Sequence, residues 1–95
     1  MTAQQLYDDI VKYVGIDNLA NWYVGIASDV EQRLFGDHAV HKVNHKWIHG
    51  QVLSAEHARS VETALIKLGF DGGTGGGDHT TVHVYAFRKD YGTVR

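Results

Sequence analysis

The sequence predicts a small α+β domain with a three-stranded, mainly antiparallel sheet flanked by helices. Three short segments alternate apolar and polar residues, as strands with one buried face do. The segments between them repeat apolar residues at helical spacing behind capping residues. With 95 residues, the chain forms one domain, residues 1–95, with room for a single hydrophobic core.

A helix is predicted over residues 2–14, because Thr2 and Gln5 form a capping box and apolar residues recur at helical spacing behind them. Gly15 is a natural helix end. A strand over residues 11–16 is the alternative, because Tyr-Val-Gly-Ile occurs there and again ten residues later.

The first strand is predicted over residues 21–27, with Tyr23 and Gly25 on one of its faces. Ser28 and Glu31 then form a second capping box, which predicts a helix that ends near Gly36. Residues 37–45 fit either a short helix or an irregular connection. The next strand is predicted over residues 46–53.

A further helix is predicted from the cap at Ser54 to Leu68, where Gly69 ends it. The glycine-rich segment 71–78 predicts a flexible loop, or a loop that responds to substrate. Alternation over residues 80–88 predicts the third strand, and residues 89–95 are expected to fray.

Composition limits the function classes. The absence of cysteine excludes disulfides, thiolate zinc sites and cysteine nucleophiles. The net charge of −2, before seven histidines are counted, opposes strong unspecific binding of nucleic acid, so any DNA should bind weakly. No apolar run approaches the ~20 residues of a membrane span, and no signal peptide is visible. We therefore expect a cytoplasmic protein without a membrane partner.

Three side chains and one glycine fit the requirements of phosphodiester hydrolysis. The Glu62 carboxylate suits a single Mg²⁺ or Mn²⁺ ion, because hard cations prefer oxygen ligands. Arg33 offers a planar guanidinium that braces a phosphate. Tyr23 would orient or activate the attacking water, and Gly25 would leave room for the scissile group.

The same positions resemble a known family. Residues 23–34 resemble the second motif and first helix of the GIY-YIG nuclease superfamily, whose arginine lies eight residues beyond the glycine. Residues 58–67 resemble its metal-binding helix, and residues 47–53 match the strand between them. The resemblance implies a GIY-YIG-like fold and a metal-dependent DNA endonuclease with Tyr23, Arg33 and Glu62 as catalytic residues.

Two motifs of that family are missing. No Gly-Ile-Tyr triplet precedes the second motif, so its tyrosine would be supplied by Tyr13 or, from a permuted final strand, by Tyr85. No asparagine follows the helix that contains Glu62. The alternative function is therefore a catalytically degenerate GIY-YIG-like module for binding or interaction, and a third is an unrelated α+β protein.

Other polar residues complete the prediction. His41 is a candidate general base, and Lys46 and Lys67 join Gly25 as candidate substrate-binding residues. His38, His41 and His45 would form a metal-binding edge if residues 37–45 were helical. A chain this short has no separate specificity domain, so targeting would need the loops, a protein partner or a homo-oligomer.

Overall fold

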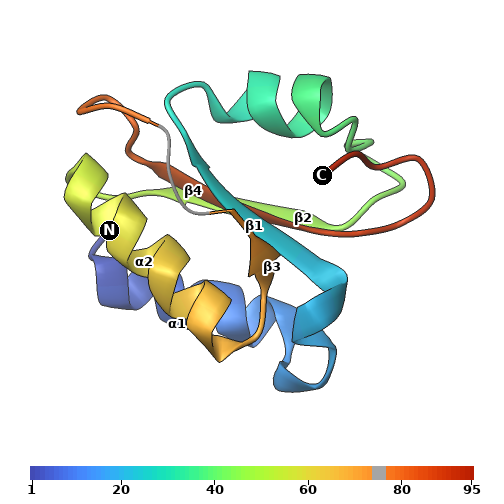
Figure 1. Ribbon diagram of the computed structural model, residues 1–95, viewed down its shortest axis with the longest axis horizontal. Coiled ribbons are helices and arrows are strands. Elements are labelled where there is room, and N and C mark those ends of the chain that lie inside the picture. Colours follow the sequence, from blue (N-terminus) through green and yellow to red (C-terminus); the bar gives the residue numbers. More distant parts are fainter. Residues whose placement is uncertain (74–76) are drawn as a thin grey trace.

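The computed structural model describes residues 1–73 and 77–95, which form a small α+β domain as predicted (Figure 1). α1 and α2 are α-helices, η1 is a 3₁₀-helix and η2 is a π-helix. The elements in chain order are α1 (Ala3–Val14), η1 (Ile16–Asn21), β1 (Trp22–Ala27), η2 (Gln32–Asp37), β2 (Trp47–Gln51), α2 (Ala55–Leu68), β3 (Asp71–Gly72) and β4 (His83–Arg88).

The sheet has four strands in the order β2-β4-β1-β3. β4, the last strand in the chain, lies between β1 and β2 and is antiparallel to both. The prediction of three strands is wrong in number, because Asp71 and Gly72 pair in parallel with Tyr23 and Val24 of β1. This fourth strand has only two residues and no apolar alternation, so the sequence pattern does not reveal it.

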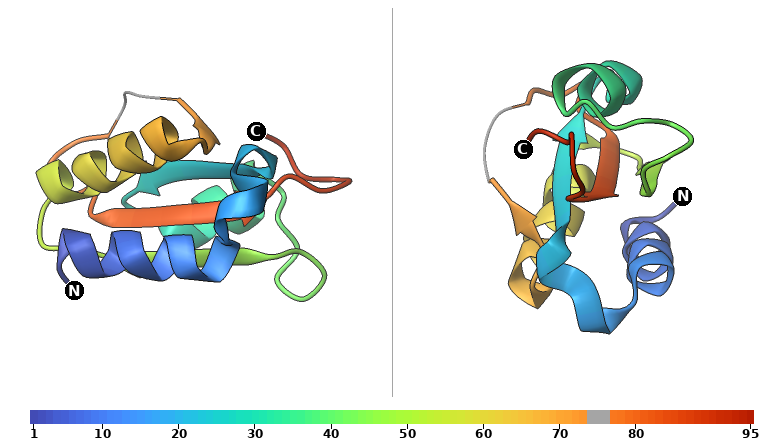
Figure 2. Two further views of the ribbon diagram at one scale, coloured as in Figure 1. Left: turned by 90° about the horizontal axis from the view of Figure 1, so that it is seen from below. Right: turned by 90° about the vertical axis from the view of Figure 1, so that its right-hand side faces the viewer.

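Helices cover both faces of the sheet. α1 and α2 lie on one face, and η2 lies on the other together with the C-terminal segment (Figure 1 and Figure 2). Two buried clusters result, one under α1 and α2 that includes Leu6, Val24 and Val84, and one under η2 that includes Leu34, Tyr85 and Phe87. Within the described residues, every helix is too short or too polar to cross a bilayer.

The two α-helices begin where the sequence predicts. The Thr2 hydroxyl accepts a hydrogen bond from the Gln5 amide at 3.1 Å, and the Gln5 side chain accepts one from the Thr2 amide at 2.9 Å. This capping box confirms the helix, and the strand alternative over residues 11–16 is wrong. The Ser54 hydroxyl caps α2 by accepting from the His57 amide at 3.2 Å, and α2 ends at Gly69 as predicted.

The helix after β1 differs from its prediction. Asp29, rather than Ser28, accepts the capping hydrogen bond, from the Gln32 amide at 3.1 Å. The Ser28 hydroxyl instead bonds the Thr80 hydroxyl at 2.8 Å, a contact with a residue 52 positions away. The helix then widens into the π-helix η2, and the chain beyond His38 continues irregularly to β2.

The C-terminal segment is held in place, so the prediction that residues 89–95 fray is wrong. The Val94 amide donates to the His38 carbonyl at 2.8 Å. Asp71 accepts from Lys89 at 3.0 Å and from Arg95 at 2.8 Å, and these hydrogen bonds lower the pKa of Asp71. The predicted glycine-rich loop includes residues 74–76, which lie outside the described residues.

Candidate functional site

Tyr85 and Gly25 define the centre of the site. They are partners across the β1–β4 ladder, on the sheet face that η2 covers. The Tyr85 ring is 1% exposed, and its hydroxyl lies over Gly25, where the Cβ of any other residue would collide with it. Glycine at position 25 therefore allows the Tyr85 hydroxyl of β4 to lie over β1.

His38, at the end of η2, is the nearest hydrogen-bonding partner of Tyr85. Its Nε2 lies 2.7 Å from the Tyr85 hydroxyl, and its Nδ1 lies 2.6 Å from the Val94 carbonyl oxygen. A carbonyl only accepts, so Nδ1 must donate to Val94, and in the neutral ring Nε2 then accepts from Tyr85. Burial lowers the pKa of His38, which favours this neutral form.

Tyr23 packs beside this pair. Its ring lies 5.1 Å from the His38 ring and 5.5 Å from the Phe87 ring, measured between centroids. The side chain is half-buried on the same face as Gly25. The structure thus brings Tyr85, from the last strand, beside Tyr23 and Gly25, which the sequence analysis places together on one face of the first strand.

Arg33 approaches the site from η2. Its guanidinium is half-exposed and pairs with Asp37 at 3.2 Å, one helical turn away. Its positive charge acts to lower the pKa of Tyr85, against the stronger effect of burial, which raises that pKa well above its usual range. Arg33 also lines a pocket of about 280 Å³ together with Asp29, Asp37 and Asp78.

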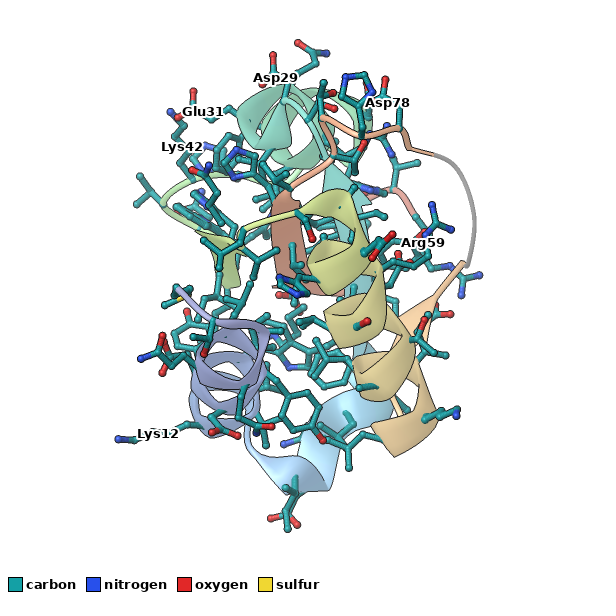
Figure 3. The ribbon with its side chains drawn as sticks, turned by 90° about the vertical axis from the view of Figure 1, so that its left-hand side faces the viewer. Lys12, Asp29, Glu31, Lys42, Arg59 and Asp78 are labelled. Atoms are coloured by element: carbon teal, nitrogen blue, oxygen red, sulfur yellow. The ribbon has the colours of Figure 1, made fainter. Side chains whose placement is uncertain are left out.

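Figure 3 shows two of these carboxylates, Asp29 and Asp78, at the same end of the molecule. They come from the start of the η2 segment and from the connection before β4. Arg33 is the one basic residue among the described residues that line this pocket. The surroundings of Arg33 are therefore acidic.

Glu62 lies inside the domain rather than at the margin of a cleft. Its side chain, on α2, is 2% exposed, and its Oε1 has no hydrogen-bond partner among the described residues. Burial raises the pKa of Glu62 to about 7, although the nearby charge of Arg59 opposes this shift. The charge of Glu62 also acts to raise the pKa of Tyr85, so the two groups are electrostatically coupled.

Four other predicted residues lie apart from this cluster. The exposed His41 lies in a turn, where its Nδ1 accepts from the amides of Val43 and Asn44. Lys46 lines a different pocket, and Lys67 is exposed on α2. Tyr13 is in α1 and packs against Trp22, in the cluster on the opposite sheet face.

The predicted edge of three histidines does not form. The segment 38–45 is not one helix, so His38 turns inward while His41 and His45 stay at the surface. Within the described residues, no group of three or more histidine or acidic side chains surrounds a common point. The sequence analysis names His38 only as part of that edge and misses its contact with Tyr85, because the two residues are 47 positions apart.

The fold and site define a small α+β domain with a buried Tyr–His pair, a neighbouring arginine and an isolated buried carboxyl group. Comparisons with protein-family models, curated proteins and solved structures found no match to this chain.

Proposed function

We propose that this protein is a divalent-metal-dependent endonuclease that hydrolyses DNA phosphodiester bonds on a GIY-YIG-like sheet. In this proposal, β4 takes the place of the missing first-motif strand and Tyr85 is the first-motif tyrosine. The central support is the Tyr85 hydroxyl, which lies over Gly25, contacts His38 and responds to the charges of Arg33 and Glu62.

Glu62 fits the role of metal ligand. Its Oε1 is a buried oxygen without a hydrogen-bond partner in the described part of the chain, which is costly unless another group binds it. Mg²⁺ commonly uses one or two carboxylates and completes its shell with water and substrate phosphate. One protein carboxylate is therefore sufficient, and a bound ion would supply charge neutralisation at the scissile phosphate. Because Glu62 lies on α2 and Tyr85 lies on the opposite face of the sheet, the proposal requires a rearrangement that lets one phosphate reach both groups.

The Tyr85–His38 pair would handle protons. Because the Tyr85 hydroxyl donates to His38 Nε2, its oxygen lone pairs are available to accept a hydrogen bond from the attacking water. As the water loses its proton to Tyr85, Tyr85 passes its own proton to Nε2. The Val94 carbonyl would stabilise the resulting imidazolium through Nδ1–H.

Arg33 and Tyr23 would position the phosphate. Arg33 would leave Asp37 and place its guanidinium against the phosphate oxygens, where two parallel hydrogen bonds are available. Tyr23 holds His38 in place through ring contact and presents its own hydroxyl on the same face. Gly25 leaves the space above β1 that the Tyr85 hydroxyl occupies, so the substrate would approach beside that hydroxyl.

One observation favours a second function, a module that binds a partner without cleaving DNA. The pocket around Arg33 contains the carboxylates of Asp29, Asp37 and Asp78, which repel a polyanion. The Asp37 pair also occupies Arg33. The same residues would instead receive a basic segment of a protein partner.

Cleavage of supercoiled plasmid in Mg²⁺ or Mn²⁺ tests the proposal. We expect nicking by the unmodified protein, and losses of at least about 100-fold for Glu62→Ala and for Tyr85→Phe. Glu56→Ala is the matched control, because Glu56 is an exposed carboxylate on the same helix. Nicking that survives in Glu62→Ala contradicts the proposed site, and a folded protein that never nicks supports the binding module.

A further inference from the structure

A second pocket lies at the other end of the β1–β4 pair, where Trp22 is opposite Arg88. Its volume is about 570 Å³. The end of α1, the helix η1, the start of β1 and the end of β4 meet around it, at the end of the sheet that the C-terminal segment also approaches (Figure 1 and Figure 2). None of the residues around the Tyr85 hydroxyl lines this pocket.

Three cations line this pocket, Lys46, Arg88 and Lys89, with Asp90 as the one acidic residue among its described lining residues. Lys89 is already paired with Asp71 at 3.0 Å, so Lys46 and Arg88 are the cations that remain to be considered. The Nε–H group of Arg88 donates to both carboxylate oxygens of Asp90, the closer one at 2.9 Å. In the described part of the chain, the two terminal nitrogens of Arg88 have no hydrogen bond and could bind a phosphate. The Lys46 ammonium is exposed and has no ion pair among the described residues.

The other polar and aromatic lining residues are Tyr13, Trp22, Asn18 and Asn21. Tyr13 is 51% exposed, and its ring is held edge-on against buried Trp22 with centroids 5.8 Å apart. Asn18 and Asn21 add side-chain amides, which both donate and accept hydrogen bonds. A pocket that is lined by both an exposed tyrosine ring and cations suits a stacked base with an attached phosphate.

We propose that this pocket binds a nucleotide unit, with its phosphate on Lys46 and Arg88 and its base against Tyr13. The unit is either a free nucleotide or one residue of an oligonucleotide, since both present the same phosphate and base. The pocket volume lies within the range of small-molecule sites. Binding there requires no cleavage, so the proposal stands apart from the chemistry at Tyr85.

Amide NMR titrations with inorganic phosphate, adenosine monophosphate and a short single-stranded DNA test this site. The Glu62→Gln protein is used without metal, so that loss of catalysis does not affect the result. We expect saturable shifts at the pocket residues and about fivefold weaker binding of all three ligands in Lys46→Ala. Tyr13→Ala should weaken the two ligands with bases but leave phosphate unchanged.

Lys12→Ala is the charge-matched control, because Lys12 lies next to Tyr13 in sequence but extends away from the rest of the molecule (Figure 3). Stronger binding of the mononucleotide identifies a free nucleotide as the ligand, and stronger binding of the DNA identifies nucleic acid. The proposal is overturned if no pocket shifts occur at about 10 mM ligand. Equal binding by Lys46→Ala and Lys12→Ala would overturn it as well.

Discussion

At the scale of single residues, Gly25 and Tyr85 depend on each other for their places. A methyl group at position 25 would occupy the space of the Tyr85 hydroxyl. Gly25→Ala must therefore move a fully buried ring, which costs about 1–3 kcal/mol of unfolding free energy. Because the ring also leaves His38, we expect DNA nicking to fall to the level of Tyr85→Phe.

Urea unfolding and plasmid nicking measure the two effects of Gly25→Ala. Gly73→Ala is the matched control, because a Cβ there would lie an acceptable 4.0 Å from the Tyr23 hydroxyl. We expect this control to stay within about 0.5 kcal/mol of the unmodified protein. Equal stability and activity in the two variants would show that Gly25 has no role in placing Tyr85.

Glu62 makes stability depend on pH. Burial raises its pKa in the folded state to about 7, from an ordinary value of 4.5. Between these two values the folded state keeps a proton that the unfolded chain releases. The free energy of unfolding is therefore highest below pH 4.5, where Glu62 is neutral in both states, and it falls as the pH rises to about 7. The pKa shift corresponds to a decrease of about 3 kcal/mol in the free energy of unfolding once the carboxyl group is ionised.

Glu62→Gln should remove this loss, because glutamine has the same shape without the ionisation. We expect the variant to gain about 3 kcal/mol relative to the unmodified protein between pH 4.5 and pH 8. Urea titrations in a chelator at the two pH values measure the gain. Glu56→Gln, at an exposed site on α2, should show none, and parallel pH profiles for all three proteins would refute the assignment.

The sequence predicts part of this residue-level arrangement. The sequence singles out Tyr23, Gly25 and Arg33, which the fold places on the same sheet face as Tyr85 or beside it. It also singles out Glu62, but the fold places this residue on α2, on the opposite face. The position of His38 beside Tyr85 escapes prediction, because the local histidine spacing suggests a different role for it. Its two ring partners, Tyr85 and Val94, lie 47 and 56 positions away.

At the scale of elements, local signals predict helices well only where those signals are complete. α1 and α2 have a capping side chain and a terminal glycine within a few residues of each end. The segment before η2 offers a capping box at Ser28 and Glu31, but Asp29 accepts the capping hydrogen bond instead, and no sequence period marks the widening into a π-helix. The wider turn gives the hydrogen bond from the His38 amide to the Arg33 carbonyl, at 2.9 Å.

The C-terminal segment is the element that fixes the orientation of His38. Val94 holds both the backbone and the ring of His38, through its amide and its carbonyl. A chain that ends at Thr93 loses the acceptor for Nδ1–H. We therefore expect the His38 ring to change from the Nδ1–H tautomer to a mixture of both tautomers.

Long-range proton–nitrogen NMR of the His38 ring measures this change. Arg95→Ala is the control, because it removes one partner of Asp71 and keeps Val94 in place. A ring that stays in the Nδ1–H form after truncation would show that Val94 does not set the tautomer. An Nε2–H form in the full chain would exclude donation from Tyr85 to His38.

At the scale of the whole molecule, the last strand, β4, joins the two longer strands β1 and β2 into one sheet. β1 and β2 have no pairing with each other, and each pairs along its length with β4. β4 also contributes four residues that are at most 1% exposed. Val84 and Ala86 belong to the cluster under α1 and α2, and Tyr85 and Phe87 belong to the cluster under η2. The order of strands was not predictable, because alternation identifies a strand but not its neighbours.

This topology predicts that the domain cannot fold until β4 is present. A chain that ends at Asp78 retains α1, α2 and the first three strands, but it leaves β2 without a partner and β1 paired only with the two-residue β3. Each large apolar side chain lost from the core removes about 1.5–3 kcal/mol of burial. Three such losses approach the 5–15 kcal/mol of a typical domain, so we expect no cooperative unfolding transition.

Urea unfolding followed by circular dichroism separates the two C-terminal truncations. The chain that ends at Thr93 keeps every strand and should unfold cooperatively, whereas the chain that ends at Asp78 should change gradually with urea. A cooperative transition in the shorter chain would mean that the two helices and the remaining strands form a core of their own. In that case the domain would fold without the strand that contains Tyr85. The observed strand order predicts the opposite, because β4 pairs with both β1 and β2 and the sheet cannot form without it.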